Sequence, residues 1–220
     1  MRRWLLSTGL FLTIVAIQAQ NVIFKVGGGL STHYGKESVG AFKIGVGYEH
    51  EFNNNWSIEP GLLFYVKGWK DPNQTVLKRD IHGNIVYDDN GKALTSVKSC
   101  TNGANYIEIP VLFNYYWVMS DVNYLVFTAG PYVSLGVAGS VNTKGDTDKG
   151  GSEMFYYEKN TFSEEGVNRF DCGIQAGIAY QFNRQLSVGI EADFGLTNFN
   201  KGGSKNLTGL ISLSYRFRLF

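Results

Sequence analysis

Apolar and polar residues alternate along most of the chain after residue 20, and this period of two limits the fold more than any other feature. In "FDCGIQAGIAYQF" (170–182), one set of alternate residues is apolar and the other is polar or small. Successive side chains of a strand point to opposite faces, so this pattern predicts a strand with one apolar and one polar face. No long stretch has the helical period, and the 27 glycines and 13 tyrosines favour strands and tight turns. The sequence therefore predicts an all-β protein.

The connections between the predicted strands alternate between short and long. Eight strands are predicted, at 22–32, 39–52, 55–69, 105–118, 122–140, 169–182, 185–198 and 206–219. Tight turns fall at 53–54, 119–121 and 183–184, and longer connections at 33–38, 70–104, 141–168 and 199–205. Short turns at one end and long loops at the other are typical of an antiparallel up-and-down barrel in an outer membrane.

A soluble β-sandwich also alternates, but with its apolar face inside. Three features favour a membrane barrel instead. The apolar series are long enough for membrane strands of roughly 9–11 residues. Aromatic residues such as Trp56, Trp117 and Phe182 gather at strand ends, where an interfacial girdle lies, and glycine is frequent on the polar face. The prediction is an eight-stranded antiparallel up-and-down transmembrane β-barrel.

The polar face of the predicted barrel carries charges of both signs. An eight-stranded barrel is filled by its own side chains, and an unpaired buried charge is costly. We therefore expect a salt-bridge network that closes the lumen. Its predicted members are Lys25, Lys43, Glu49, Glu59, Lys67, Glu108, Asp171, Glu191, Asp193, Arg216 and Arg218.

The first residues have the features of a secretory signal peptide. Two arginines precede an apolar stretch from Trp4 to Ile17, and the small residue Ala19 suits cleavage. A signal anchor is the alternative, but the apolar stretch is short and has no charged residue on its far side. The predicted division is a signal peptide over 1–19 and one barrel domain over 20–220, located in the outer membrane of a Gram-negative bacterium.

Charge and cysteine content bear on possible partners and on a possible disulfide. The formal net charge is +1, and no segment has basic residues interleaved with aromatic ones. No nucleic-acid partner is therefore expected. Cys100 and Cys172 are the only cysteines. A disulfide between them and two separate thiols both fit the sequence. No cofactor is predicted.

The three histidines are weak candidates for catalysis. His33 could share a strand face with Ser31, but no acidic residue is placed to orient it. His50 lies at one of the alternate positions that apolar residues occupy in its strand, near the end of the barrel with the short turns. His82 lies in the loop "DIHGN". No catalytic residue is predicted, and the chain is not expected to be an enzyme.

Two loop segments carry oxygen-bearing side chains around glycine, "YDDNGK" (87–92) and "GDTDKGG" (145–151). Neither has the complete calcium loop, so no metal site is predicted. "DDNG" better fits a hairpin turn, because Asn-Gly is the favoured type I′ pair, and we expect the 70–104 connection to continue as a β-ribbon above the membrane. In the third long connection, four residues are candidates to cover the barrel mouth or meet a partner protein: Met154, Phe155, Tyr156 and Tyr157.

Between Asn105 and Phe217, several motifs recur in the order of a known family. The segments are "NYIEIPVLFNYYW", "LVFTAGPYVSLGV", "FDCGIQAGIAYQFNRQLSVGIEADFGLTNF" and "LISLSYRF". They resemble the PorT-like outer-membrane β-barrel family common in Bacteroidetes. The resemblance implies an outer-membrane barrel, usually described as porin-like. A few relatives take part in protein secretion and gliding machinery.

The last strand, "LISLSYRFRLF", ends in aromatic residues. Barrels of this class carry an aromatic-ended final strand that their assembly machinery reads. Family members commonly end at the position of Phe217, whereas three more residues follow here. We therefore predict that Tyr215 and Phe217 form the assembly signal and that Phe220 is an overhang.

The sequence favours a structural or interaction role for a monomeric barrel that contacts outer-membrane lipid and, through its outer loops, a protein partner. A porin-like channel for small solutes and a component of a secretion system are the alternatives. A lipid-modifying enzyme is the weakest of the four, because its best residue, His33, has no partner in the sequence pattern.

Overall fold

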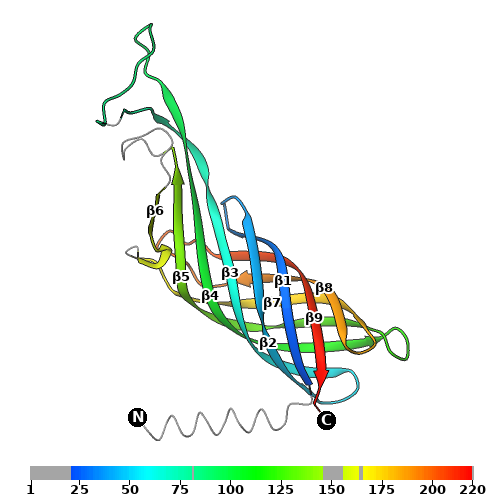
Figure 1. Cartoon of the computed structure of the whole chain (residues 1–220). Helices are drawn as coiled ribbons and strands as arrows, with labels where there is room; N and C mark the ends of the chain where they lie inside the picture. The colour runs from blue at the N-terminus through cyan, green and yellow to red at the C-terminus, as the bar shows by residue number, and fades with distance from the viewer. Residues whose placement is uncertain (1–20, 81, 146–155, 164–165, 220) are drawn as a thin grey trace, which may run out of the picture.

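The computed structural model describes residues 21–80, 82–145, 156–163 and 166–219, and eight long strands in this part of the chain form a closed barrel (Figure 1). These strands are β1 (Asn21–His33), β2 (Val39–Glu51), β3 (Trp56–Leu77), β4 (Thr95–Val118), β5 (Tyr124–Lys144), β7 (Phe170–Phe182), β8 (Leu186–Gly195) and β9 (Asn206–Arg218). A short strand, β6 (Tyr156–Lys159), and a 3-10 turn, η2 (Thr161–Ser163), lie between β5 and β7 in the sequence. No helix among the described residues is long and apolar enough to cross a membrane.

Neighbouring barrel strands are antiparallel throughout. β1 pairs with β9, beginning at Asn21 opposite Arg218, and β4 pairs with β5, ending at Val118 opposite Tyr124. These two pairings close the ring. Closure gives the backbone N–H and C=O groups of the first and last strands hydrogen-bond partners. The barrel wall therefore has no free edge in the membrane. The predicted eight-stranded up-and-down barrel is confirmed.

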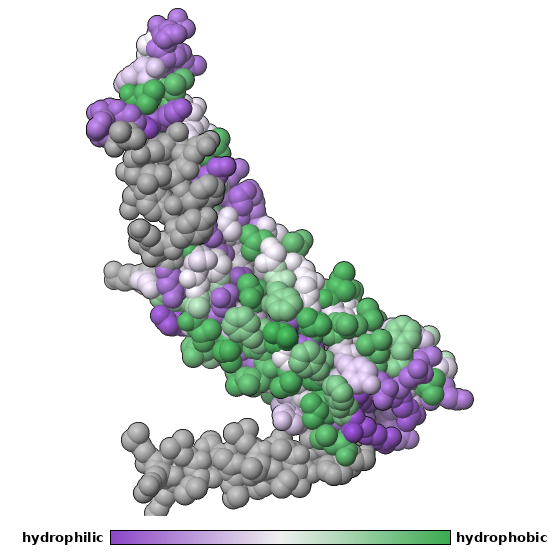
Figure 2. Space-filling model, in the orientation of Figure 1, coloured by the Kyte–Doolittle hydropathy of each residue, from purple (hydrophilic) through white to green (hydrophobic). Residues whose placement is uncertain are grey.

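The outer wall of the barrel is apolar. Alternate residues of each strand leave the interior, among them Phe64, Ile109 and Ile211, whose exposed fractions are 38%, 48% and 67%. Figure 2 shows hydrophobic side chains gathered in a band across the barrel strands, with hydrophilic residues at the far tip of the molecule and around the opposite end. Exposed apolar surface of this extent marks a wall that faces lipid.

β3 and β4 continue beyond the barrel as a two-stranded ribbon (Figure 1). The strands predicted at 55–69 and 105–118 are too short, because pairing continues as far as Leu77 opposite Thr95. A bulge between Asp71 and Gln74 interrupts it once. The predicted ribbon is therefore present. Both of its faces meet water above the membrane, so the apolar alternation that marks a barrel strand is lost there.

Two turns with a central asparagine differ in geometry. Between β7 and β8, Asn183 and Arg184 have φ values of 47° and 58°, which makes a type I′ turn. At the ribbon tip, Gly91 has a φ of 75° whereas Asn90 is not left-handed, and the Gly91 amide donates to the Asp88 carbonyl over 3.0 Å. This is a type I turn followed by a glycine bulge. The hairpin expected at Asn90–Gly91 is present, but the expected type I′ geometry is wrong.

Candidate functional site

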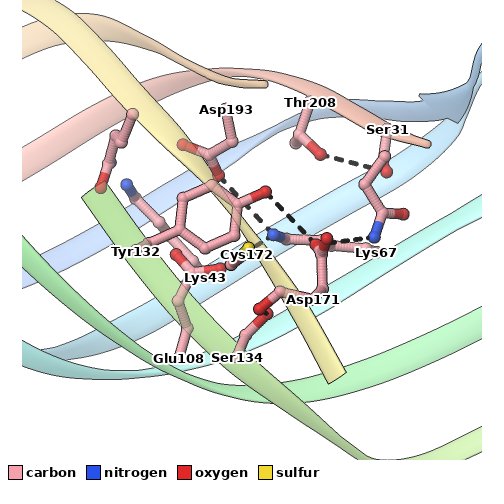
Figure 3. A network of polar contacts seen from close by, with 12 residues as sticks. Ser31, Lys43, Lys67, Glu108, Tyr132, Ser134, Asp171, Cys172, Asp193 and Thr208 are labelled. Atoms are coloured by element: carbon pink, nitrogen blue, oxygen red, sulfur yellow. Dashed lines mark hydrogen bonds and ion pairs between the residues drawn. The ribbon is translucent and has the colours of Figure 1, made fainter. Parts of the chain in front are cut away.

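A layer of polar side chains crosses the barrel interior, and every barrel strand contributes to it (Figure 3). None of these residues is more than 3% exposed. Each lies on the inward parity of its strand, so the alternation that covers the outer wall with apolar groups fills the lumen with polar ones. In strand order they are Ser31, Lys43, Lys67, Glu108, Tyr132, Asp171, Asp193 and Thr208.

Lys67 is at the centre of this layer. Its Nζ lies 2.8 Å from Glu108 Oε2 and 3.9 Å from Asp193 Oδ2. It also lies 4.2 Å from the ring centre of Tyr65 and 4.7 Å from that of Tyr132. Carboxylates and aromatic faces together stabilise an ammonium group that water does not reach. One buried cation therefore links β3 with β4, β5 and β8.

Two further ion pairs lie in the interior. Lys25 Nζ is 2.7 Å from Glu59 Oε1. Lys43 pairs with Glu191, whose Oε2 also accepts a hydrogen bond from Gln175 Nε2 over 2.6 Å. Because charges inside a barrel are costly unless they are paired, these contacts explain why lysines and acids both occur on the inward face.

Arg216 organises the turn end of the lumen. One guanidinium nitrogen lies 2.9 Å from Glu49 Oε2, and another lies 3.1 Å from Glu51 Oε1. The guanidinium also contacts the Tyr116 hydroxyl, and Ser57 Oγ donates to Glu49 Oε1 over 2.6 Å. A buried carboxylate with this many donors is held in a single position.

Towards the loop end, the lumen changes from ionic to aromatic. The His33 ring stacks on Trp69 with 3.8 Å between centroids, and Phe199 packs edge-on against Trp69 at 4.6 Å. Phe162 meets Tyr106 at 5.5 Å in a T-shaped contact. All five side chains are buried. Together they fill the loop end of the barrel, and we refer to them as the aromatic cluster.

Phe162 reaches the aromatic cluster from η2, which is not part of the barrel wall. Two glycines of β5 make room for η2: a Cβ at Gly136 would overlap the Phe162 ring, and a Cβ at Gly139 would lie 2.7 Å from Thr161 Cβ. Thr161 Oγ1 donates to the Gly103 carbonyl over 2.6 Å. A segment of the third loop is thus seated in the barrel mouth by side-chain contacts.

Two cavities of the lumen lie towards the turn end. One cavity of about 500 Å³ opens there beside Tyr116, Tyr124 and Arg184. Further in, a cavity of about 40 Å³ lies beside Lys25 and Glu59, which is room for a few waters only. The fully buried layer around Lys67 lies beyond it.

The structure places the predicted lumen charges in the interior with one exception. Glu191 is the most accessible of those inside, with 15% of its side chain exposed. Arg218 is exposed, so its predicted place in the lumen is wrong. It is the last residue of β9 and pairs with Asn21, the first of β1, so the wall ends there and does not enclose its side chain.

The aromatic residues predicted to cover the mouth are only partly described. Met154 and Phe155 lie outside the described residues, and Tyr156 and Tyr157 lie in β6. In the described part of the chain, Phe162 enters the mouth, and the sequence argument missed it because its neighbours show no periodic pattern. Tyr65 and Trp69 were missed as well. Both lie at alternate positions of β3 that point inwards like Lys67, so the alternation could have identified them.

The histidines form no hydrolytic arrangement among the described residues. His33 Nε2 lies 2.7 Å from Asn206 Oδ1, whereas Ser31 Oγ accepts a hydrogen bond from the Gly68 amide over 3.3 Å. Both side chains are 1% exposed. His50 packs against Phe52 at the turn end with 5.5 Å between ring centres.

No group of three potential metal ligands occurs among the described residues. In the 87–92 segment, Asp88 Oδ1 accepts the backbone amides of Asn90 and Lys92 over 2.9 and 2.8 Å, so the carboxylate supports the turn. Most of the 145–151 segment lies outside the described residues. Cys100 and Cys172 are free thiols, so of the two alternatives the structure shows separate cysteines.

Comparison with known proteins identifies one family. The model of the family described as "Outer membrane protein beta-barrel domain" matches residues 12–201. No curated protein matches the chain.

Several solved barrels are similar, all at low identity. The attachment invasion locus protein Ail of Yersinia pestis is 12% identical, with 90% of this chain and 96% of that chain covered and a TM-score of 0.39. Neisserial surface protein A is 13% identical, with 90% of this chain and 96% of that chain covered and a TM-score of 0.42. A mutant porin of Rhodopseudomonas blastica is 9% identical over 89% and 99% of the two chains, with a TM-score of 0.19. These scores are too low to bear on function.

Proposed function

The chain belongs to the outer membrane protein beta-barrel domain family, and from this premise we propose that it is a closed barrel that holds a rigid ribbon outside the cell for contact with a protein partner. Membership of the family makes it an integral protein of the outer membrane. The ribbon formed by β3 and β4 is the observation that carries the proposal, because it adds nothing to the barrel wall and extends well beyond it (Figure 1).

The tip of the ribbon consists of two turns with the same chemistry, "KRDIHGNI" (78–85) and "VYDDNGKA" (86–93). In the first, the amides of His82 and Asn84 donate to Asp80 Oδ1 over 2.8 and 2.9 Å. Asp88 does the same in the second turn. The hydrogen bond from the Asn84 amide lowers the pKa of Asp80, so its carboxylate stays charged and keeps the turn closed.

Backbone hydrogen bonds join the two turns into one unit. The amides of Lys78, Val86 and Leu94 donate in a ring to the carbonyls of Leu94, Lys78 and Val86, each over 2.9 Å. The unit therefore keeps its shape without a hydrophobic core. It presents Tyr87, which is 58% exposed, and below it Leu77 and Val97 are 43% and 57% exposed on one ribbon face. Exposed apolar groups on a rigid support are typical of a protein-binding surface.

A matched pair of variants tests the ribbon proposal. In one, residues 79–93 are replaced by Asn-Gly, and in the other Tyr87, Leu77 and Val97 are changed to serine. Both should lose proteins that co-purify with the full chain from detergent-solubilised outer membrane, while the barrel still folds. If the set of bound proteins is the same for wild type and both variants, the ribbon is not the contact surface.

The closed lumen is the second part of the proposal. It is supported by the buried layer around Lys67 and by the aromatic cluster at the loop end. A porin-like channel is the alternative, and planar-bilayer recordings of the pure protein separate the two. We expect no steady single-channel current. Large, stable currents would favour the channel.

We also propose that the chain is a PorT-like barrel of the kind common in Bacteroidetes and acts as a monomer. The motifs between Asn105 and Phe217 support the PorT-like assignment. For some relatives of that kind a role in protein secretion is known, and such a role would agree with an outward contact surface. A lipid-modifying enzyme has the least support, since His33 and Ser31 are buried and do not meet.

Assembly is proposed to depend on the end of β9. Tyr215 and Phe217 lie on the lipid face with 39% and 52% exposed and 4.7 Å between ring centres. We expect Phe217→Ala to reduce the amount of folded barrel in the outer-membrane fraction, whereas deletion of residues 218–220 leaves it nearly unchanged. The opposite pattern in membrane fractionation would mean that the assembly machinery reads the final residue.

A further inference from the structure

A small pocket lies at the turn end of the barrel, beside the ends of β7, β8 and β9. Its volume is about 180 Å³, and three arginines line it: Arg184, Arg216 and Arg218. Asn183 and Gln185 of the β7–β8 turn add amide groups, and Glu51 supplies one carboxylate. Arg216 and Glu51 belong to the ion pairs of the lumen, whereas Arg184, Arg218, Asn183 and Gln185 take no part in the ion pairs described above.

The three arginines are not equivalent. Arg216 is paired with Glu49 and Glu51. Among the described residues, no ion pair is found for Arg184 or Arg218. Instead, the Arg184 guanidinium lies 5.2 Å from the ring centre of Tyr124, and this contact holds it at the turn end of the barrel. Two guanidinium groups thus face one pocket without a salt bridge to another described residue.

The backbone at Arg184 supports a role for this side chain. The residue has a φ of 58° in the second central position of a type I′ turn, where glycine is preferred because a Cβ is unfavourable there. An arginine breaks this local preference. Such a departure is typical of a site with a function.

We propose that this pocket binds a phosphate group, and that its source is the headgroup of a phospholipid in the periplasmic leaflet. Guanidinium groups bind phosphate through paired hydrogen bonds, and neighbouring amides add donors. The lipid-facing wall ends next to the pocket: Phe182 and Leu186 flank its turn, and Phe217 and Leu219 flank Arg218 in sequence, all between 38% and 52% exposed. A lipid whose chains lie against these residues has its headgroup at the height of the two arginines.

Calorimetric titration of the purified full chain in a non-ionic detergent tests the proposal. The probes are dihexanoyl phosphatidylglycerol, inorganic phosphate and uncharged dihexanoylglycerol. The binding-site variant is R184N/R218Q, with asparagine at 184 because that residue tolerates the left-handed backbone. The matched control is K201Q/K205Q, which removes two cations from the loop end.

We expect the phosphatidylglycerol to bind wild type and control equally and to bind R184N/R218Q at least ten-fold more weakly, with no binding of dihexanoylglycerol. Equal affinity for inorganic phosphate would keep the phosphate pocket but overturn the lipid source. Equal binding to wild type and R184N/R218Q would overturn the pocket itself. If the double variant does not fold, R218Q alone, at the exposed end of β9, should still weaken binding several-fold, and an unchanged affinity would again overturn the proposal.

Discussion

The two halves of the lumen are closed in different ways. Towards the turn end, charged side chains of the barrel strands pair with one another across the interior, as Arg216 does with Glu49. Towards the loops, the aromatic cluster is completed by Phe162, which belongs to η2 and not to the wall. The ionic half therefore closes as soon as the strands form the barrel. The aromatic half closes only when part of a loop enters it.

The two halves also differ in what holds them. Buried ion pairs add little net stability, because desolvation offsets their attraction, but loss of one partner leaves a charge without compensation. Aromatic burial adds stability roughly in proportion to the area removed from water. Disruption of the ionic half should therefore unfold the barrel, whereas disruption of the aromatic half should open the loop end first.

The largest effect is expected from Lys67→Ala. It leaves Glu108 and Asp193 buried without their cation and should lower the free energy of unfolding by about 3–5 kcal/mol. Urea titration of the barrel in phospholipid vesicles, followed by tryptophan fluorescence, measures it. Lys70→Ala is the matched control, since Lys70 pairs with Glu37 at the exposed base of the ribbon, and it should cost no more than about 1 kcal/mol. Equal losses would show that the ionic half is not the more sensitive one.

Phe162→Ala should have the next largest effect. Removal of a buried ring costs about 3 kcal/mol, but we expect this loss in the seating of η2 and not in the barrel. Limited proteolysis should therefore cut the 145–169 connection faster while the barrel keeps its midpoint in urea. Phe52→Ala, at an aromatic residue that is 56% exposed at the turn end, is the control. A lowered barrel midpoint with unchanged proteolysis would contradict the division into halves.

A smaller effect is expected from Gly136→Ala. The added methyl group overlaps the Phe162 ring and should displace η2 at a cost of about 1–2 kcal/mol. The same proteolysis assay detects it. Gly209→Ala is matched, because its Cβ would meet nothing within 4 Å, and it should behave as wild type. If both glycine variants resist cleavage equally, η2 is not held by this contact.

The smallest effect on stability is expected when residues 79–93 are replaced by Asn-Gly. The tip is held by its own backbone hydrogen bonds, so the barrel should change by less than about 0.5 kcal/mol. Urea titration as for Lys67→Ala measures this. A loss comparable to that of Phe162→Ala would mean that the ribbon supports the loop end of the barrel.

The ionic half could be predicted from the sequence, and the part of the aromatic half that η2 contributes could not. Lys25 and Glu59 each lie in a strand with strict alternation, so parity alone directs them inwards. Parity fails at Arg218, because it says which way a side chain points but not where the wall ends. Phe162 lies in no periodic segment, and its place depends on the space left by Gly136, which only the folded barrel shows.

On the side of β3 away from β4, residues 71–76 pair with no strand among the described residues, and the bulge in this stretch affects how the edge could meet neighbouring molecules. A long free strand edge outside the cell would invite pairing with the same edge of another copy diffusing in the crowded membrane. Pro72 lies within the bulge between Asp71 and Gln74, where it removes one amide donor and the bulge breaks the flat line of the edge. The edge is thus poorly suited to self-assembly, and the exposed side chains of the tip stay available for a different molecule.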